Sequence, residues 1–250
     1  MEWTDEAIVL GVRKHGETTV IAELMTRARG RHLGLVQGGR SRTMRPVLQP
    51  GNSVRATWRA RLDEHLGQYR IEPLKSRAAE LMESAHGIYA LQTLASHLRL
   101  LPERDAHAEL FETLAIVLDN LQEPDIAAEL VVRFELAMLD ELGFGLDLTA
   151  CAATGTRQNL VYVSPKTGRA VSHDAGEPWA DRMLMLPSFL LERELARIES
   201  ASLEDIEAGF ELTKHFFWRN IHGPRGLEIP SERESLLKAV RRLMTKENHP

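Results

Sequence analysis

Apolar and polar positions alternate through much of the first eighty residues, and turns containing glycine separate the alternating segments. The clearest segment is SVRATWRARL, residues 53–62. Its apolar face consists of Val54, Ala56, Trp58, Ala60 and Leu62, and its polar face consists of Arg55, Thr57, Arg59 and Arg61. A period of two is typical of a half-buried β-strand. Aliphatic and β-branched residues predict four further strands, in residues 6–15, 19–27, 32–39 and 67–74.

Five short strands with glycine turns favour a small barrel of the oligonucleotide-binding (OB) type, and a β-sandwich is the alternative. From about residue 76 the apolar period lengthens to three or four residues, which indicates amphipathic helices. We expect one helix over residues 81–98, a second capped by Asp105, and a third that begins at Pro124 and ends before Gly143. The predicted fold class is α+β, with an OB-type barrel over residues 1–78 and a mainly α-helical domain over residues 79–250. A small β-hairpin is expected within residues 148–177.

The distribution of charge adds to this picture, because the two predicted domains differ in the sign of their net charge. The whole chain carries 31 basic and 36 acidic residues, a formal charge of −5, yet basic residues exceed acidic ones in the first eighty positions. Residues 27–62 contain no acidic residue and carry these arginines: Arg27, Arg29, Arg31, Arg40, Arg42, Arg45, Arg55, Arg59 and Arg61. Their mutual repulsion is uncompensated unless an anion binds, so we predict that this set contacts nucleic acid. The alternative for any single arginine is a solvated strand face that discourages edge pairing.

Aromatic residues for stacking on bases are few in this region. Trp58 points inward by its alternation, which leaves Trp3, Tyr69, His15 and His32 as candidates. Binding should therefore depend on phosphate contacts and show little sequence preference.

Other candidate sites are weaker. Cys151, the only cysteine, could form a zinc site with His173 and Asp174, but a single thiolate without partners at fixed spacing makes us expect no metal and no cofactor. No motif assembles a nucleophile, a base and an oxyanion hole, so we expect a binding protein and not an enzyme. No apolar run approaches the roughly 18 residues that span a bilayer, and the first residues lack a secretion signal, which favours a cytoplasmic protein.

One cation stands out in the helical region. Arg133 lies among apolar residues in RFELAMLDELGFG, residues 133–145. The simple interpretation is a surface ion pair with Glu129 or Glu135, and Phe134 is expected in the core. The alternative is a site for a protein partner.

Four motifs in order along the chain resemble one family. They are AIVLGVRKHGETTVIAELMTRARGR at the start, QGGRSR followed by LQPG, RFELAMLDELGFGLDLTAC, and LEIPSERE near the C-terminus. Together they are similar to the bacterial RecO family of recombination mediators and DNA repair proteins.

The resemblance implies an OB barrel followed by a helical domain. It also implies a nucleoid-associated protein that binds single- and double-stranded DNA, anneals complementary strands and, with RecR, helps RecA load onto DNA coated by single-stranded-DNA-binding protein. The helical domain of this family receives the acidic C-terminal tail of that coating protein, and here Arg133 and Phe134 are the candidate contacts. An RNA-binding factor of translation or RNA processing with the same barrel is the alternative function.

The chain departs from the family at one point. Many members carry four cysteines as a zinc module, but the corresponding positions here read Cys151, Thr154, Ser172 and Ala175. The resemblance therefore does not predict a zinc site in this chain. We expect the hairpin to hold by packing and hydrogen bonds alone.

Overall fold

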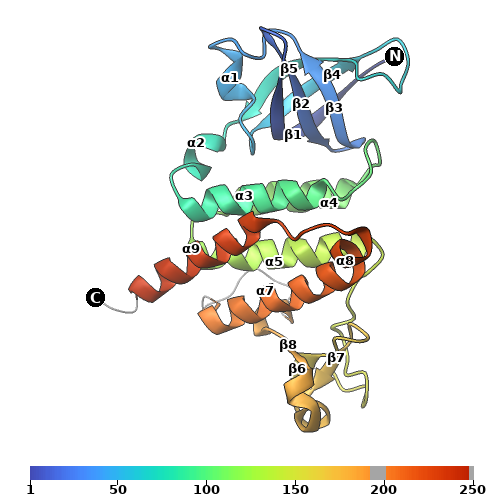
Figure 1. The fold of residues 1–250 in the computed structure, drawn as a ribbon, viewed down its shortest axis with the longest axis vertical. Helices are drawn as coiled ribbons and strands as arrows, with labels where there is room; N and C mark the ends of the chain where they lie inside the picture. Colours follow the sequence, from blue (N-terminus) through green and yellow to red (C-terminus); the bar gives the residue numbers. More distant parts are fainter. Residues whose placement is uncertain (192–200, 248–250) are drawn as a thin grey trace. The chain divides into compact units, whose positions relative to one another are not determined.

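The computed structural model describes residues 1–191 and 201–247. The chain divides into two compact units, Met1–Gln122 and Glu123–Pro250, and each is described by itself (Figure 1). The first unit contains the barrel together with helices that follow it. The division near residue 78 made from the sequence separates the barrel from those helices, and it stays a prediction.

The barrel of the first unit is closed and has five strands. They are β1(Glu2–His15), β2(Thr19–Thr26), β3(Gly30–Val36), β4(Ser53–Arg59) and β5(Gln68–Lys75). Their order is β1-β2-β3-β5-β4, and β4 also pairs with β1, which closes the barrel. Only the short contact between β3 and β5 is parallel. The predicted α+β class with an OB-type barrel is confirmed.

The alternation predicted for β4 is correct up to Arg59. Val54, Ala56 and Trp58 are fully buried, whereas Leu62 is 44% exposed because the chain leaves the sheet after Arg59. The Trp58 indole nitrogen donates to the Leu66 carbonyl oxygen at 3.0 Å. The loop then turns tightly over this ring at Gly67 (φ +63), where a Cβ would lie 2.4 Å from the indole. A residue with a side chain cannot occupy that position.

An aromatic cluster fills one end of the barrel. Trp3 stacks on Trp58 with ring centroids 5.7 Å apart, and the Tyr69 hydroxyl lies 2.7 Å from His32 Nδ1. Burial lowers the pKa of His32 to about 4, and the positive charge of Arg104 acts in the same direction. Because His32 and Tyr69 are almost completely buried, the expectation that they remain free to stack on bases is wrong.

Four helices complete the first unit: α1(Met44–Val47), α2(Ala78–Leu81), α3(Ala85–Leu98) and α4(Ala108–Leu118). The helix expected over residues 81–98 is thus split, and α3 begins after Ser84, whose Oγ accepts from the Gly87 amide at 3.0 Å. Asp105 does not cap α4, which begins after His107. The segment before α4 lies along β3 instead, with the Arg104 amide donating to the Arg31 carbonyl oxygen at 2.8 Å.

In the part of the second unit that the structure describes, the long helices are α5(Pro124–Glu141), α7(Leu203–Phe217) and α9(Ser231–Glu247). The start of α5 at Pro124 is as predicted, and Gly143 follows its end with φ 82, the left-handed conformation expected there. Its shorter elements are α6(His173–Gly176), η1(Glu177–Arg182), η2(Ser188–Leu190), η3(Trp218–His222) and α8(Gly223–Arg225).

A buried ion pair joins the three long helices. Arg233 on α9 donates to both carboxylate oxygens of Glu135 on α5, at 2.6 and 3.0 Å. The Thr213 hydroxyl on α7 also donates to Glu135 and accepts from Arg233 at 2.7 Å. Both charged side chains are almost completely buried, so each depends on the other for compensation.

The predicted hairpin is present and has a third strand. It comprises β6(Leu160–Val163), β7(Ala170–Ser172) and β8(Leu184–Met185), in the order β7-β6-β8. The preceding loop pairs with it through backbone bonds between Asp147 and Ala170 and between Ala152 and Ala170, each 2.8 Å long. Ser172 Oγ donates to the buried Cys151 sulfur at 3.4 Å. Residues 1–191 and 201–247 contain no cluster of side chains able to hold a metal ion.

Candidate nucleic-acid interface

The nine predicted arginines do not form one uniform surface. The expectation that they lack acidic partners is wrong for Arg27, Arg31 and Arg59, because acids from other parts of the sequence fold against them. These ion pairs join Arg27 to Glu6 and Glu112, Arg31 to Glu23 and Glu103, and Arg59 to Glu2. Arg31 is also largely buried and donates to the Leu101 carbonyl oxygen.

Strand register balances the charge on the outer face of β4. Arg55 lies directly opposite Glu6 of β1 and Glu72 of β5. Arg59 lies opposite Glu2 on one side and Gln68 on the other. Opposite charges facing each other across strands stabilise a sheet, so these two arginines fit the solvated strand face. That they contact nucleic acid stays a prediction.

Arg29 has a different environment. Its guanidinium lies 5.4 Å above the ring of Trp3, which is half-buried and backed by Trp58. A cation over an indole face is favourable, and it keeps Arg29 at the surface near one end of the barrel.

Arg40, Arg42 and Arg45 belong to a separate group after β3. Together with α1 and the start of α2 they line an open hollow of about 780 Å³, which we call the α1–α2 hollow. Its remaining lining is mainly apolar or uncharged: Pro46, Gln49, Ser76, Ala78, Ala79 and Met82. No acidic side chain is among these lining residues. Positive charge thus stands beside an apolar surface.

Arg40 has a structural role in this group. Its guanidinium donates to the carbonyl oxygens of Gly16 and Glu17, at 3.2 and 2.6 Å, and so attaches the segment after β3 to the turn between β1 and β2. Arg42 and Arg45 are exposed. These two are the members of the group best placed to meet a phosphate.

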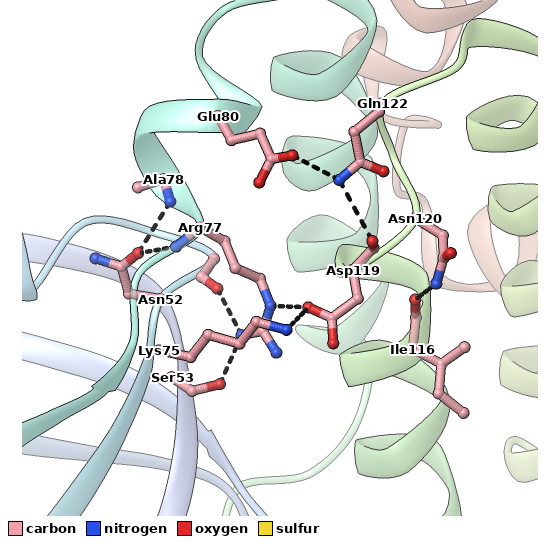
Figure 2. A network of polar contacts seen from close by, with 11 residues as sticks. Asn52, Ser53, Lys75, Arg77, Ala78, Glu80, Ile116, Asp119, Asn120 and Gln122 are labelled. Carbon is pink, nitrogen blue, oxygen red and sulfur yellow. Dashed lines mark hydrogen bonds and ion pairs between the residues drawn. The ribbon is translucent and has the colours of Figure 1, made fainter.

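Buried Asn52 holds the two walls of the α1–α2 hollow together. Its side-chain nitrogen donates to the carbonyl oxygens of Pro46 and Val47 on α1. Its side-chain oxygen accepts from the amides of Arg77 and Ala78 (Figure 2). The sequence alone gives no sign of this role, because a lone asparagine after a glycine has no distinctive pattern.

Arg77 extends this network to the end of α4. Its guanidinium donates to Asp119 and to Ser53 Oγ, and Lys75 donates to the same carboxylate at 2.6 Å (Figure 2). Partial burial raises the pKa of Asp119, but the hydrogen bonds from Arg77 and Lys75 outweigh burial and hold the pKa below its ordinary value. Asp119 is therefore charged at neutral pH.

A second hollow of about 770 Å³ lies at the other end of β4. We call it the loop hollow, because residues 60–67 form one side of it; its lining includes Leu35, Arg59, Arg61, His65 and Gln68. Arg104, which follows α3 in the left-handed conformation (φ 65), donates to the carbonyl oxygens of Asp63 and His65 and so fixes this loop. No pattern in the sequence indicates that role for Arg104.

In the second unit, Arg133 and Phe134 differ in accessibility. Arg133 donates to Glu129 at 2.9 Å and to the Phe189 carbonyl oxygen, and its guanidinium lies 5.9 Å above the Phe189 ring. The ion pair with Glu129 is one of the two alternatives given by the spacing. Phe134 is fully buried in the core, so of the two predicted partner contacts only Arg133 reaches the surface.

Comparison with known proteins identifies the family of this chain. The family described as "Recombination protein O N terminal" matches residues 1–77, and "Recombination protein O C terminal" matches residues 83–227. The chain belongs to the RecO family. The two RecO matches cover the barrel and most of the helical region.

Curated relatives agree with this assignment. "DNA repair protein RecO" of Mesorhizobium japonicum is 60% identical over 242 residues, which are 97% of this chain and 94% of the relative. The protein of the same name from Agrobacterium fabrum is 55% identical over 250 residues, 100% of this chain and 97% of the relative. Membership of the RecO family supports a role in DNA repair. Among the residues that the structure describes, no helix is long and apolar enough to cross a membrane.

Proposed function

We propose that this chain is a recombination mediator that binds single- and double-stranded DNA and anneals complementary strands. The observation that carries the proposal is the α1–α2 hollow of an OB-type barrel, where Arg40, Arg42 and Arg45 stand without an acidic lining residue. Cations in such a position neutralise phosphates and release their counterions. They also reduce the repulsion between two strands that must approach each other, which is the physical requirement for annealing.

RecR, RecA and the single-stranded-DNA-binding protein are the partners in this proposal, and family membership supports them. With RecR, the chain would help RecA load onto strands that the coating protein covers. A mediator of this kind acts by binding, and the proposal assigns no catalytic step and no cofactor to the chain.

Arg133 is the proposed contact for the acidic tail of the coating protein. A carboxylate of the tail would compete with Glu129 for the Arg133 guanidinium, which is 22% exposed. Glu129→Gln should therefore strengthen binding of a tail peptide, and Arg133→Gln should weaken it about tenfold, because a hydrogen bond to a charged group contributes roughly 1.5–3 kcal/mol. Binding of bare DNA should be unchanged in both variants. Equal tail affinity in the parent and in Arg133→Gln would place the tail site elsewhere.

Annealing of complementary strands coated with single-stranded-DNA-binding protein tests the proposal as a whole. We expect the chain to accelerate annealing well above the rate without protein. A rate equal to that background would refute the mediator role. Affinities for single-stranded DNA and for RNA of the same sequence, measured at one salt concentration, distinguish the DNA role from the RNA-binding alternative.

A further inference from the structure

We infer that the barrel holds two nucleic-acid strands at once, one in the α1–α2 hollow and one in the loop hollow. This inference rests on the proposed annealing function and adds to it where each strand binds. The two hollows share no lining residue. Each is an open surface hollow, of about 780 and 770 Å³ respectively.

The hollows lie at opposite ends of the hairpin that β4 and β5 form. Ser53, at the start of β4, accepts a hydrogen bond from Arg77 beside the α1–α2 hollow, whereas Arg59, the last residue of β4, lines the loop hollow. A strand rises about 3.3 Å per residue, so seven residues place the two hollows roughly 20 Å apart. That separation is large enough for two strands to bind without overlapping.

The surface between the hollows does not favour one continuous strand. A nucleic-acid backbone that ran along the outer face of β4 between the hollows would pass Glu6 and Glu72, which flank Arg55. These carboxylates repel phosphates. Phosphate contacts are thus favoured at the two ends of β4 and opposed between them.

Each hollow also has its own support. Asn52 holds α1 against α2, and Arg77 attaches the start of α2 to Asp119 at the end of α4, whereas Arg104 fixes residues 60–67 at the loop hollow. Because the two sets of hydrogen bonds have no residue in common, a change in one hollow should leave the other intact. The sites can therefore be tested separately.

The test uses two short, non-complementary oligonucleotides of about eight nucleotides, within the usual size of a site on one OB barrel. One carries a donor dye and the other an acceptor dye, and bound oligonucleotides are counted per chain on the full-length protein. The parent should bind two per chain and show energy transfer. Arg45→Glu in the α1–α2 hollow and Arg61→Glu in the loop hollow should each leave one bound oligonucleotide and reduce energy transfer at least fivefold. Arg70→Glu on β5, an equal charge change at a residue that lines neither hollow, should retain two.

Annealing of naked complementary strands gives the second readout. Each hollow variant should anneal about tenfold more slowly while its affinity for a single strand falls only about twofold, because the remaining site still binds. If the barrel instead has one continuous binding site, the affinity for a single strand and the annealing rate should fall together in each variant. The decrease should be roughly fivefold or more at 0.1 M salt for each phosphate that is no longer neutralised. That result, or one oligonucleotide per chain in an annealing-competent parent, would overturn this inference alone. A parent that does not anneal would overturn the proposed function as well.

Discussion

The capacity of an arginine to bind phosphate depends on the acids around it in the fold, and this differs between arginines that are close in sequence. Arg42 is exposed on the α1–α2 hollow, which no acidic side chain lines. Arg55 is also exposed, yet strand register places it between Glu6 and Glu72. A phosphate near Arg55 would also meet these carboxylates.

We therefore predict that Arg42→Ala and Arg55→Ala have different effects on the salt dependence of single-strand binding. Removing one arginine that neutralises a phosphate should reduce the slope of log K against log[salt] by about 0.7. We expect that change for Arg42→Ala and almost none for Arg55→Ala. Titrations of one oligonucleotide at several salt concentrations measure both slopes. Equal slopes in the two variants would show that charge balance on β4 does not decide which arginine binds phosphate.

His32 should make the stability of the barrel depend on pH. Its pKa is about 4 in the folded chain, because burial disfavours the charged ring, and about 6.5 when unfolded. The unfolded chain then binds the extra proton as the pH falls from 6.5 toward 4. The contribution of the neutral His32 ring to the free energy of unfolding is fully present above pH 6.5. The free energy of unfolding should decrease by about 2 kcal/mol between pH 7 and pH 5.

Urea unfolding at the two pH values measures this effect. The His32→Gln variant should lose most of the difference, whereas His15→Gln, at an exposed position, should retain it. An unchanged pH dependence in His32→Gln would assign the effect to other groups.

At the scale of the elements, short helices depend on polar side chains that are distant in sequence. The helices α1 and α2 have four residues each and are too short to be stable alone. Asn52 satisfies backbone groups of both. Its amide therefore determines the shape of the α1–α2 hollow.

Asn52→Ala should destabilise the first unit by about 2–3 kcal/mol, because buried backbone donors and acceptors lose their partner. Hydrogen exchange of the α1 and α2 amides should accelerate more than that of the β1 and β2 amides. Asn120→Ala serves as the control, since Asn120 is exposed in the same unit and its side chain donates to the Ile116 carbonyl oxygen one turn earlier. Uniform acceleration across the unit would mean that Asn52 contributes to global stability alone.

The small sheet of the second unit should be stable without zinc. Cys151 is the only cysteine of the chain, and a closed tetrahedral site needs four ligands. Metal analysis of the purified protein should give well under one zinc per chain, and chelators should not change the melting temperature. Stoichiometric zinc whose removal lowers the melting temperature would contradict this prediction.

At the scale of the whole molecule, the helices that follow the barrel share ion pairs with it. Asp119 at the end of α4 pairs with Arg77 and Lys75, and Glu112 pairs with Arg27. The compact unit accordingly extends to Gln122, beyond the barrel itself.

We predict that a fragment of residues 1–122 is more stable than a fragment of residues 1–78 by about 1–2 kcal/mol, because the shorter one lacks Asp119 and Glu112, the acidic partners of Lys75, Arg77 and Arg27. Urea unfolding of both fragments measures the difference. A variant of the longer fragment with Asp119→Asn should lie between the two. Equal stability would support a domain boundary near residue 78.

Local patterns in the sequence were enough to predict whether each region forms strands or helices, because the period of apolar residues reflects which positions are buried. The alternation in residues 53–59 specified β4 and its inner face, and the start of α5 followed from Pro124. The motifs between residues 7 and 234 specified the family. These features depend on residues near each other in the chain, so they can be read without the fold.

Which arginines remain available to bind phosphate depends instead on contacts made in the folded chain. Glu6, Glu72 and Glu112 are distant in sequence from the arginines that they neutralise, and the strand register and helix packing bring them together. Asn52 and Arg104 define the two hollows through bonds to residues that are distant in sequence or lie in another element. Electrostatic compensation is a property of distance in space, which the order of residues does not specify.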